Sequence, residues 1–147
     1  MSMFSALEVS GSAMEAERQR AEVVAANMAN AETTRTPGGG PYRRKQVVFS
    51  TSGNSPFQLL LAGFRRLTGR AAGSVRVSRV VNDPSPSVMR YEPGHPDADK
   101  NGYVAYPAIN PVSEMVDLMG AVRAYQLNAA AVNATKQMVQ GSMDILK

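Results

Sequence analysis

The stretch that decides the fold is Met115–Leu146, which reads MVDLMGAVRAYQLNAAAVNATKQMVQGSMDIL. Steps of three and four residues through it select ten positions, of which all but one are apolar. These positions are Met115, Leu118, Val122, Tyr125, Ala129, Val132, Lys136, Val139, Met143 and Leu146. Apolar residues at this spacing over four heptads predict a long helix of the coiled-coil or bundle type. With Pro111 and Ser113 as its entry signal, the helix is expected over about 112–146 and would be roughly 50 Å long.

A second, weaker series of the same kind lies at the N-terminus. Its positions are Phe4, Leu7, Gly11, Met14, Arg18, Ala21, Ala25 and Met28. The small residues in this series would allow a close approach of another helix. The series predicts a helix over 3–31 that ends between Asn30 and Thr34, before Pro37.

Turn and strand signals occupy the middle of the chain. Thr36–Pro41 has the composition of a turn or loop, and strands are expected at 42–50, 74–82, 87–91 and 103–106. The second of these alternates Val75, Val77 and then Val80 with polar neighbours. Residues 51–73 fit either a strand or a helical turn.

The sequence therefore predicts an α+β fold in three segments. These are an N-terminal helix within 1–34, a β-rich middle with a basic surface over 35–110, and a C-terminal helix within 111–147. The two helices are expected to pair as a coiled coil. Because two amphipathic helices still leave apolar surface in water, further partners in trans are expected.

Composition narrows the possible functions. The 147 residues include no cysteine, which excludes disulfides, thiolate zinc sites and cysteine nucleophiles. Net charge is −3 over residues 1–32, +9 over 33–90 and −2 over 91–147. Glu8 and Glu15 interrupt the N-terminus, so it fits neither a cleavable signal peptide nor a membrane span. Composition alone would favour a cytoplasmic protein.

One segment imitates a metal site. Asp97–Gly102 matches the opening of a calcium-binding loop, but Ala108 stands where the bidentate carboxylate is needed. We expect a structured turn, with His95 hydrogen-bonded inside it. A divalent-cation-dependent enzyme centred on His95, Asp97 and Asp99 is a weak alternative, because a catalytic zinc site usually has three protein ligands and a general base. No nucleophile elbow or phosphate-binding loop is present, so no enzyme, catalytic residue, metal or cofactor is expected.

The basic middle suggests a second function class. Arg43–Lys45 and several later arginines could bind phosphates, and Tyr42 and Phe49 could stack on bases. The later arginines are Arg65, Arg66, Arg70, Arg76 and Arg79. A nucleic-acid-binding module dimerised by its coiled coil is thus the alternative function, although no recognised binding motif accompanies the charge.

Several segments resemble the flagellar basal-body rod proteins. Val24–Thr34 is similar to the Asn-x-Ala-Asn signature near the N-terminus of rod and hook proteins. Thr34–Lys45 and Tyr91–Pro107 resemble the proximal-rod members in particular. Within the final helix, Glu114–Leu118 and Arg123–Asn128 also resemble the family.

The resemblance implies a structural rod subunit that assembles through its terminal helices into a drive shaft and export-channel wall. It implies other rod subunits, copies of itself and the flagellar export apparatus with its chaperones and gate as partners, without nucleic acid or membrane insertion. It also implies export without a cleaved signal peptide and a place in the rod that crosses the periplasm, which replaces the cytoplasmic expectation.

Subunit contacts are expected on the two helical stripes, in the turn after the first helix and in the following loop. The residues expected to make them are Leu7, Met14, Asn27, Met28, Asn30, Arg43, Arg44, Met115, Leu118, Val122, Tyr125, Val132, Val139 and Met143.

Overall fold

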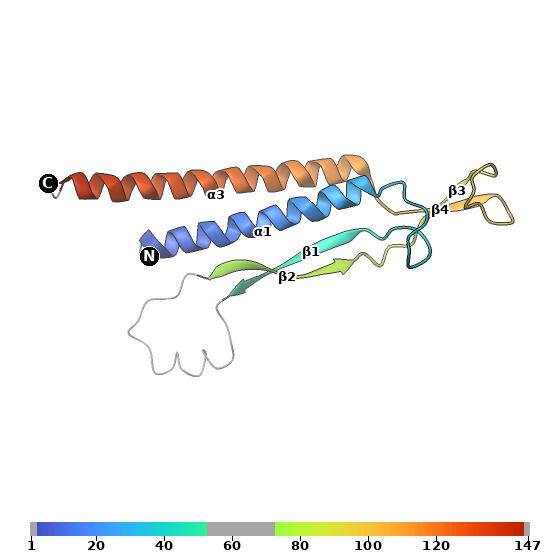
Figure 1. The fold of residues 1–147 in the computed structure, drawn as a ribbon, viewed down its shortest axis with the longest axis horizontal. Helices are drawn as coiled ribbons and strands as arrows, with labels where there is room; N and C mark the ends of the chain where they lie inside the picture. The colour runs from blue at the N-terminus through green and yellow to red at the C-terminus, as the bar shows by residue number, and fades with distance from the viewer. Residues whose placement is uncertain (1–2, 53–72, 146–147) are drawn as a thin grey trace, which may run out of the picture. The chain divides into compact units, whose positions relative to one another are not determined.

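A computed structural model describes residues 3–52 and 73–145 (Figure 1). The helices are α1 (Met3–Ala29) and α3 (Pro111–Ile145), and the strands are β1 (Lys45–Ser52), β2 (Ser74–Asn82), β3 (Val88–Tyr91) and β4 (Tyr103–Tyr106). The predicted α+β fold, with a long helix at each end and strands between them, is confirmed. Within the undecided stretch at 51–73, residues 53–72 lie outside the described residues, and Arg65, Arg66 and Arg70 are among them. Leu146 also lies outside the described residues.

Asparagine side chains hydrogen-bond to main-chain groups at the C-terminal end of α1 and at the N-terminal end of α3. The Nδ2 of Asn30 donates to the C=O of Ala26 and thereby satisfies a carbonyl of the last turn of α1. At the start of α3, the Oδ1 of Asn110 accepts from the N–H groups of Val112 and Ser113. Asn110 is thus the N-cap and Pro111 the first helical residue, so the expected entry signal was right for Pro111 and wrong for Ser113.

The strands form two small sheets, each of two strands. β1 lies beside β2, and β3 pairs antiparallel with β4 in the register Val88↔Tyr106 to Tyr91↔Tyr103. β1 begins at Lys45, three residues later than predicted. In β2 the half-buried series runs from Val75 through Val77 to Val81, because side chains alternate strictly between the two faces of a strand. Val80 points the other way and is 47% exposed, so its expected place in that series was wrong.

The described residues fall into two compact units, and each draws on both helices. Unit 1 contains residues from 1–19, 49–78 and 121–147, and unit 2 contains 20–48 and 79–120. The buried residues of unit 1 are Ala16, Ala121 and Thr135, and those of unit 2 include Val24, Asn27, Val104, Tyr106 and Glu114. The three-segment division remains a prediction. Neither α1 nor α3 is long and apolar enough over its described residues to cross a membrane.

Candidate functional site

The outward side of α3 presents large apolar side chains to solvent. Near its start, Val112, Met115, Val116 and Met119 follow the spacing i, i+3, i+4, i+7, and all are more than half exposed. Residues at this spacing lie on one face of a helix. We call these four residues the α3 patch. An exposed apolar face of this kind is typical of a protein–protein contact.

The predicted stripe on α3 divides between the two sides of the helix. Met115, Val122, Tyr125 and Met143 are exposed, whereas Leu118, Val132 and Val139 are half-buried. The fully buried positions of α3 are Glu114, Ala121 and Thr135. Each lies one residue before a position of the stripe. The chain therefore buries a line of small and polar residues within itself and leaves much of the apolar stripe available to other molecules.

The buried positions of α1 also differ from its predicted series. The predicted contacts Leu7, Met14 and Met28 are half-buried. The buried positions are Ala16, Val24 and Asn27, none of which belongs to the predicted series. A small residue such as Ala16 permits a close approach of neighbouring backbone. A prediction that selects the most hydrophobic positions does not favour such small residues.

Asn27 is the centre of a polar junction in unit 2, formed by Asn27, Tyr42, Arg44, Lys45 and Glu114. Its Nδ2 donates to the C=O of Lys45 (2.8 Å) and to Oε2 of Glu114 (3.0 Å). Its Oδ1 accepts from the N–H of Lys45 (2.9 Å) and from the hydroxyl of Tyr42 (3.2 Å). Two donated and two accepted bonds use the full capacity of the amide. One side chain on α1 thus holds the first residue of β1 and the first turn of α3.

Arg44 neutralises the buried carboxylate of this junction. Glu114 is 1% exposed, and its Oε1 accepts from Nε of Arg44. The same guanidinium lies 3.4 Å from Asp117 and 3.7 Å from Asp83, and Arg20 of α1 lies 3.5 Å from Asp117. A buried carboxylate is tolerated only when it is paired and hydrogen-bonded. The junction meets both conditions.

The environment shifts the pKa values of Tyr42, Tyr106 and Asp83 in unit 2. Burial, with a contribution from the charge of Glu114, raises the pKa of Tyr42. The hydrogen bond to Glu92, together with burial, raises the pKa of Tyr106. Hydrogen bonds from Ser85 and the nearby Arg44 lower the pKa of Asp83 below its ordinary value of 3.8. Tyr42 and Tyr106 thus stay protonated, and Asp83 stays ionised, across the neutral range.

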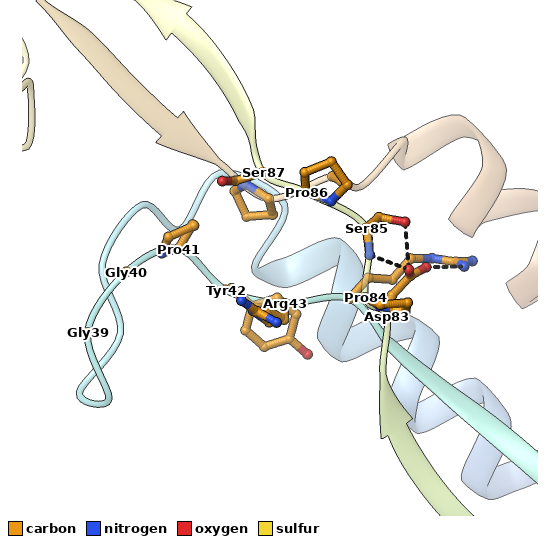
Figure 2. Close-up of a pocket in the computed structure, with 13 residues that line it drawn as sticks. Gly39, Gly40, Pro41, Tyr42, Arg43, Asp83, Pro84, Ser85, Pro86 and Ser87 are labelled. Carbon is orange, nitrogen blue, oxygen red and sulfur yellow. Dashed lines mark hydrogen bonds and ion pairs between the residues drawn. The ribbon is translucent and has the colours of Figure 1, made fainter.

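A groove of about 260 Å³ lies next to the polar junction in unit 2. Figure 2 shows the loop through Gly39 and Gly40 on one side and the Asp83–Ser87 segment on the other, with Ser85 hydrogen-bonded back to Asp83. Arg43 lines the groove and is exposed. Among the described residues it has no ion-pair partner, whereas the adjacent Arg44 has three.

The predicted contacts in this region therefore lie in different surroundings. Arg43 is at the surface, and Asn30 is half-buried at the end of α1. Asn27 is 1% exposed and Arg44 is committed to internal ion pairs, so both have internal roles. Their contact with another subunit remains untested.

The segment that imitates a calcium loop forms the turn expected for it. The Oδ1 of Asp99 accepts from the N–H groups of Asn101 and Tyr103, and Gly102 has φ +80°. A Cβ at Gly102 would lie 2.9 Å from the ring of Tyr91, so glycine is required there. The Nδ1 of His95 accepts from the N–H of Asp97, which confirms the hydrogen-bonded histidine. The carboxylate of Asp97 is directed to Thr34 and Arg35, and no group of three potential metal-binding side chains occurs within 3–52 and 73–145.

Sequence reasoning missed three functional side chains. Glu114 was a residue of the resemblance but not a predicted contact, Asn110 was overlooked as the cap, and Ser12 was assigned no role. The Oγ of Ser12 accepts from the N–H of Val75 (3.1 Å) in unit 1. Asn110 before Pro111 is a readable cap signal. The other two residues depend on contacts distant in sequence.

Comparison with known proteins finds similarity to flagellar basal-body rod proteins. The family described as "Flagella basal body rod protein" matches residues 7–35, and "Flagellar basal body rod FlgEFG protein C-terminal" matches residues 100–145. The flagellar basal-body rod protein FlgC of Bacillus subtilis is 40% identical over all of both chains. That of Borreliella burgdorferi is 38% identical over the whole of this chain and 99% of its own. That of Salmonella typhimurium is 39% identical over 95% of this chain and 94% of its own.

None of these similarities favours the nucleic-acid alternative or an enzyme. Matches of this identity over nearly the full length of both chains leave one conclusion. The chain belongs to the FlgC family of flagellar basal-body rod proteins, as a structural subunit of the rod.

Proposed function

We propose that the chain enters the rod by burying the α3 patch against helices of neighbouring rod subunits, including copies of itself. The single observation that supports this proposal is the exposure of Val112, Met115, Val116 and Met119 on one face of α3. Removal of apolar surface from water stabilises association by roughly 25 cal/mol per Å². The predicted stripe positions Val122, Tyr125 and Met143 extend the exposed apolar surface along the helix.

In this proposal the polar junction fixes the angle between the helices and β1. Asn27 bonds to both main-chain groups of Lys45, and Glu114 ties the start of α3 to the same amide. The half-buried residues Leu7, Met14, Met28, Leu118, Val132 and Val139 would join the subunit contacts at the edges of the buried line. Arg43 and Asn30 would contact a neighbour near the groove.

The proposal also includes the location of the subunit in the cell and the route by which it is exported. A tube wall of such helices would form the drive shaft and the wall of the export channel in the proximal rod, within the periplasmic space. The chain would reach it through the flagellar export apparatus without a cleaved signal peptide.

Deletion of the gene in its host, followed by electron microscopy of basal bodies, tests the proposed function. We expect loss of swimming with no rod or hook beyond the base, and recovery of both with the wild-type chain. Normal basal bodies and normal motility in the deletion strain would overturn the proposal. A partial rod that stops at one level would show where the subunit is placed.

A further inference from the structure

β3 is an open edge strand whose free main-chain groups can be identified. Among the described residues it pairs only with β4. The N–H of Glu92 donates to the C=O of Gly102 (2.8 Å), so this opposite pair is hydrogen-bonded. Opposite pairs in an antiparallel ladder alternate between bonded and non-bonded. Arg90 and Val88 therefore bond to β4, whereas Met89 and Tyr91 direct their N–H and C=O groups to the open edge.

The side chains of β3 give this edge little protection. Every residue of the strand is exposed, with Met89 at 54% and Tyr91 at 65%. Natural proteins usually blunt an edge strand with proline, with charge or with a covering segment. Here the only charge is Arg90, which lies over the ring of Tyr106 at 4.6 Å. An exposed apolar edge of this kind is suited to strand addition.

We propose that β3 accepts an extended segment of a different basal-body protein as a third strand of the β3–β4 sheet. The added segment would bond to the outward N–H and C=O groups of Met89 and Tyr91. This inference rests on the proposed function, because it requires that the chain lies beside other proteins in the rod.

Charge determines which segment fits. Two copies of β3 could pair antiparallel through their outward residues, with Met89 of each copy opposite Tyr91 of the other. This register places Arg90 directly opposite Arg90. Like charges at directly opposite positions destabilise a sheet. The complementary residue opposite Arg90 is a carboxylate, and none of β1, β2, β3 or β4 carries one. None of the four described strands of a second copy therefore fits, and we place the occupant in another protein.

The pleat gives the remaining chemistry of the occupant. Tyr91 and Tyr103 stack edge to face on one side of the sheet, with ring centroids 5.3 Å apart, and Met89 shares that side. Arg90 lies on the opposite side. An added strand that follows the same alternation presents apolar side chains beside Met89 and Tyr91 and an acidic side chain between them. The expected segment is extended, with the pattern apolar–acidic–apolar.

Hydrogen exchange on isolated basal bodies and on the purified chain tests this directly. We expect the peptide containing Met89 and Tyr91 to exchange at least roughly tenfold more slowly in the assembled rod. Equal exchange in both states would overturn strand addition. Because the chain would still be present in the rod, that result would leave the proposed function standing. Absence of the chain from basal bodies would overturn the proposed function instead.

A proline at position 89 separates main-chain pairing from side-chain contact. Met89→Pro removes an N–H that β4 does not use, so the hairpin should persist as it does in other edge strands with proline. We expect this variant to lose motility while the purified protein keeps its unfolding midpoint within a few degrees. The matched control Met89→Gln keeps the N–H and should swim. Full motility of Met89→Pro, or equal loss with Met89→Gln, would overturn strand addition.

The identity of the occupant is tested by placing the photo-crosslinker p-benzoylphenylalanine at position 89 and sequencing the adducts from assembled basal bodies. An adduct with an apolar–acidic–apolar segment of another rod protein supports the proposal. An adduct with a second copy of this chain, or none, overturns it.

In a parallel assay, Arg90→Glu should reduce motility strongly and Arg90→Lys should not.

Discussion

The two terminal helices are similar in kind, but they present different surfaces. Apart from Phe4, the exposed residues described on α1 are charged or are alanines. The large apolar residues exposed on α3 are Val112, Met115, Val116, Met119, Val122, Tyr125, Leu127, Met138 and Met143. The two helices therefore have different tasks, and of the two, α3 presents nearly all the large exposed apolar side chains among the described residues.

α1 has its own task inside the chain. Ser12 accepts from the N–H of Val75 near the start of β2, and Asn27 bonds to Lys45 at the start of β1. Each bond lies within one compact unit. Polar side chains of α1 thus hold the beginning of each of these two strands, whereas α3 provides surface. This contrast leads to predictions about assembly on one helix and about stability on the other.

The largest expected effect follows from placing charge on each helix in turn. Met115→Asp with Met119→Asp should abolish rod assembly, because burial of an unpaired carboxylate in an interface costs several kcal/mol, or more than roughly a hundredfold in affinity. Both sites are exposed, so the purified chain should unfold within about 0.5 kcal/mol of wild type per site. Motility, electron microscopy and urea unfolding measure these outcomes.

Ala25→Asp on α1 is the matched control, since Ala25 is also exposed. We expect this variant to assemble. If it fails as completely as the α3 variant, the outward side of α1 is also a buried interface. The contrast between the helices would then be wrong.

The sequence predicted the type and position of the helices and strands better than it predicted which side of each element is buried. The heptad series at 115–146 and the alternation in 74–82 gave both the type and the position of their elements, because periodicity depends on local geometry alone. The side of α3 that faces inward was not predictable from hydrophobicity. Glu114 is buried because Arg44 and Asn27, distant in sequence, satisfy its charge and its oxygens.

The contact residues illustrate the same limit. Asn27 was expected to contact another subunit because it belongs to a motif of the family. Nothing local shows that its amide completes four bonds with Lys45, Tyr42 and Glu114. Arg43 and Arg44 are neighbours of the same charge, yet one is exposed and the other is internally paired. A polar motif thus marks an important residue without showing whether its role is internal.

Asn27→Ala tests the internal role of α1 most strongly. The change leaves part-buried main-chain groups of Lys45 and the buried carboxylate of Glu114 without their partner, and each such loss costs about 1–3 kcal/mol. We expect the free energy of unfolding to fall by about 2–4 kcal/mol in urea titrations. Asn30→Ala is the control, because the side chain of Asn30 bonds only to Ala26 and Thr33 of its own helix end among the described residues. A loss with Asn30→Ala as large as that with Asn27→Ala would contradict the assignment of Asn27 as the anchor.

Ser12→Ala should have a smaller effect, of about 1 kcal/mol. The variant removes the acceptor of the Val75 N–H, which is half-buried. Ser10→Ala on the same helix provides the control, since it makes the same change in helix propensity and, among the described residues, the side chain of Ser10 has no hydrogen bond to β2. Thermal unfolding of the three proteins, with hydrogen exchange at Val75, measures the difference. If exchange at Val75 is unchanged in Ser12→Ala, Ser12 does not hold the strand.

The smallest expected effect is a pH dependence at the edge of the polar junction. Because the pKa of Asp83 is lowered from 3.8, its ionised form is favoured in the folded state. Its contribution is present above that value and is lost as the pH falls through the lowered pKa. The thermal midpoints of wild type and Asp83→Asn should therefore differ at pH 7 and converge toward pH 3. If the difference for Asp83→Asn stays constant down to pH 3, it reflects the shape of the side chain and not its charge.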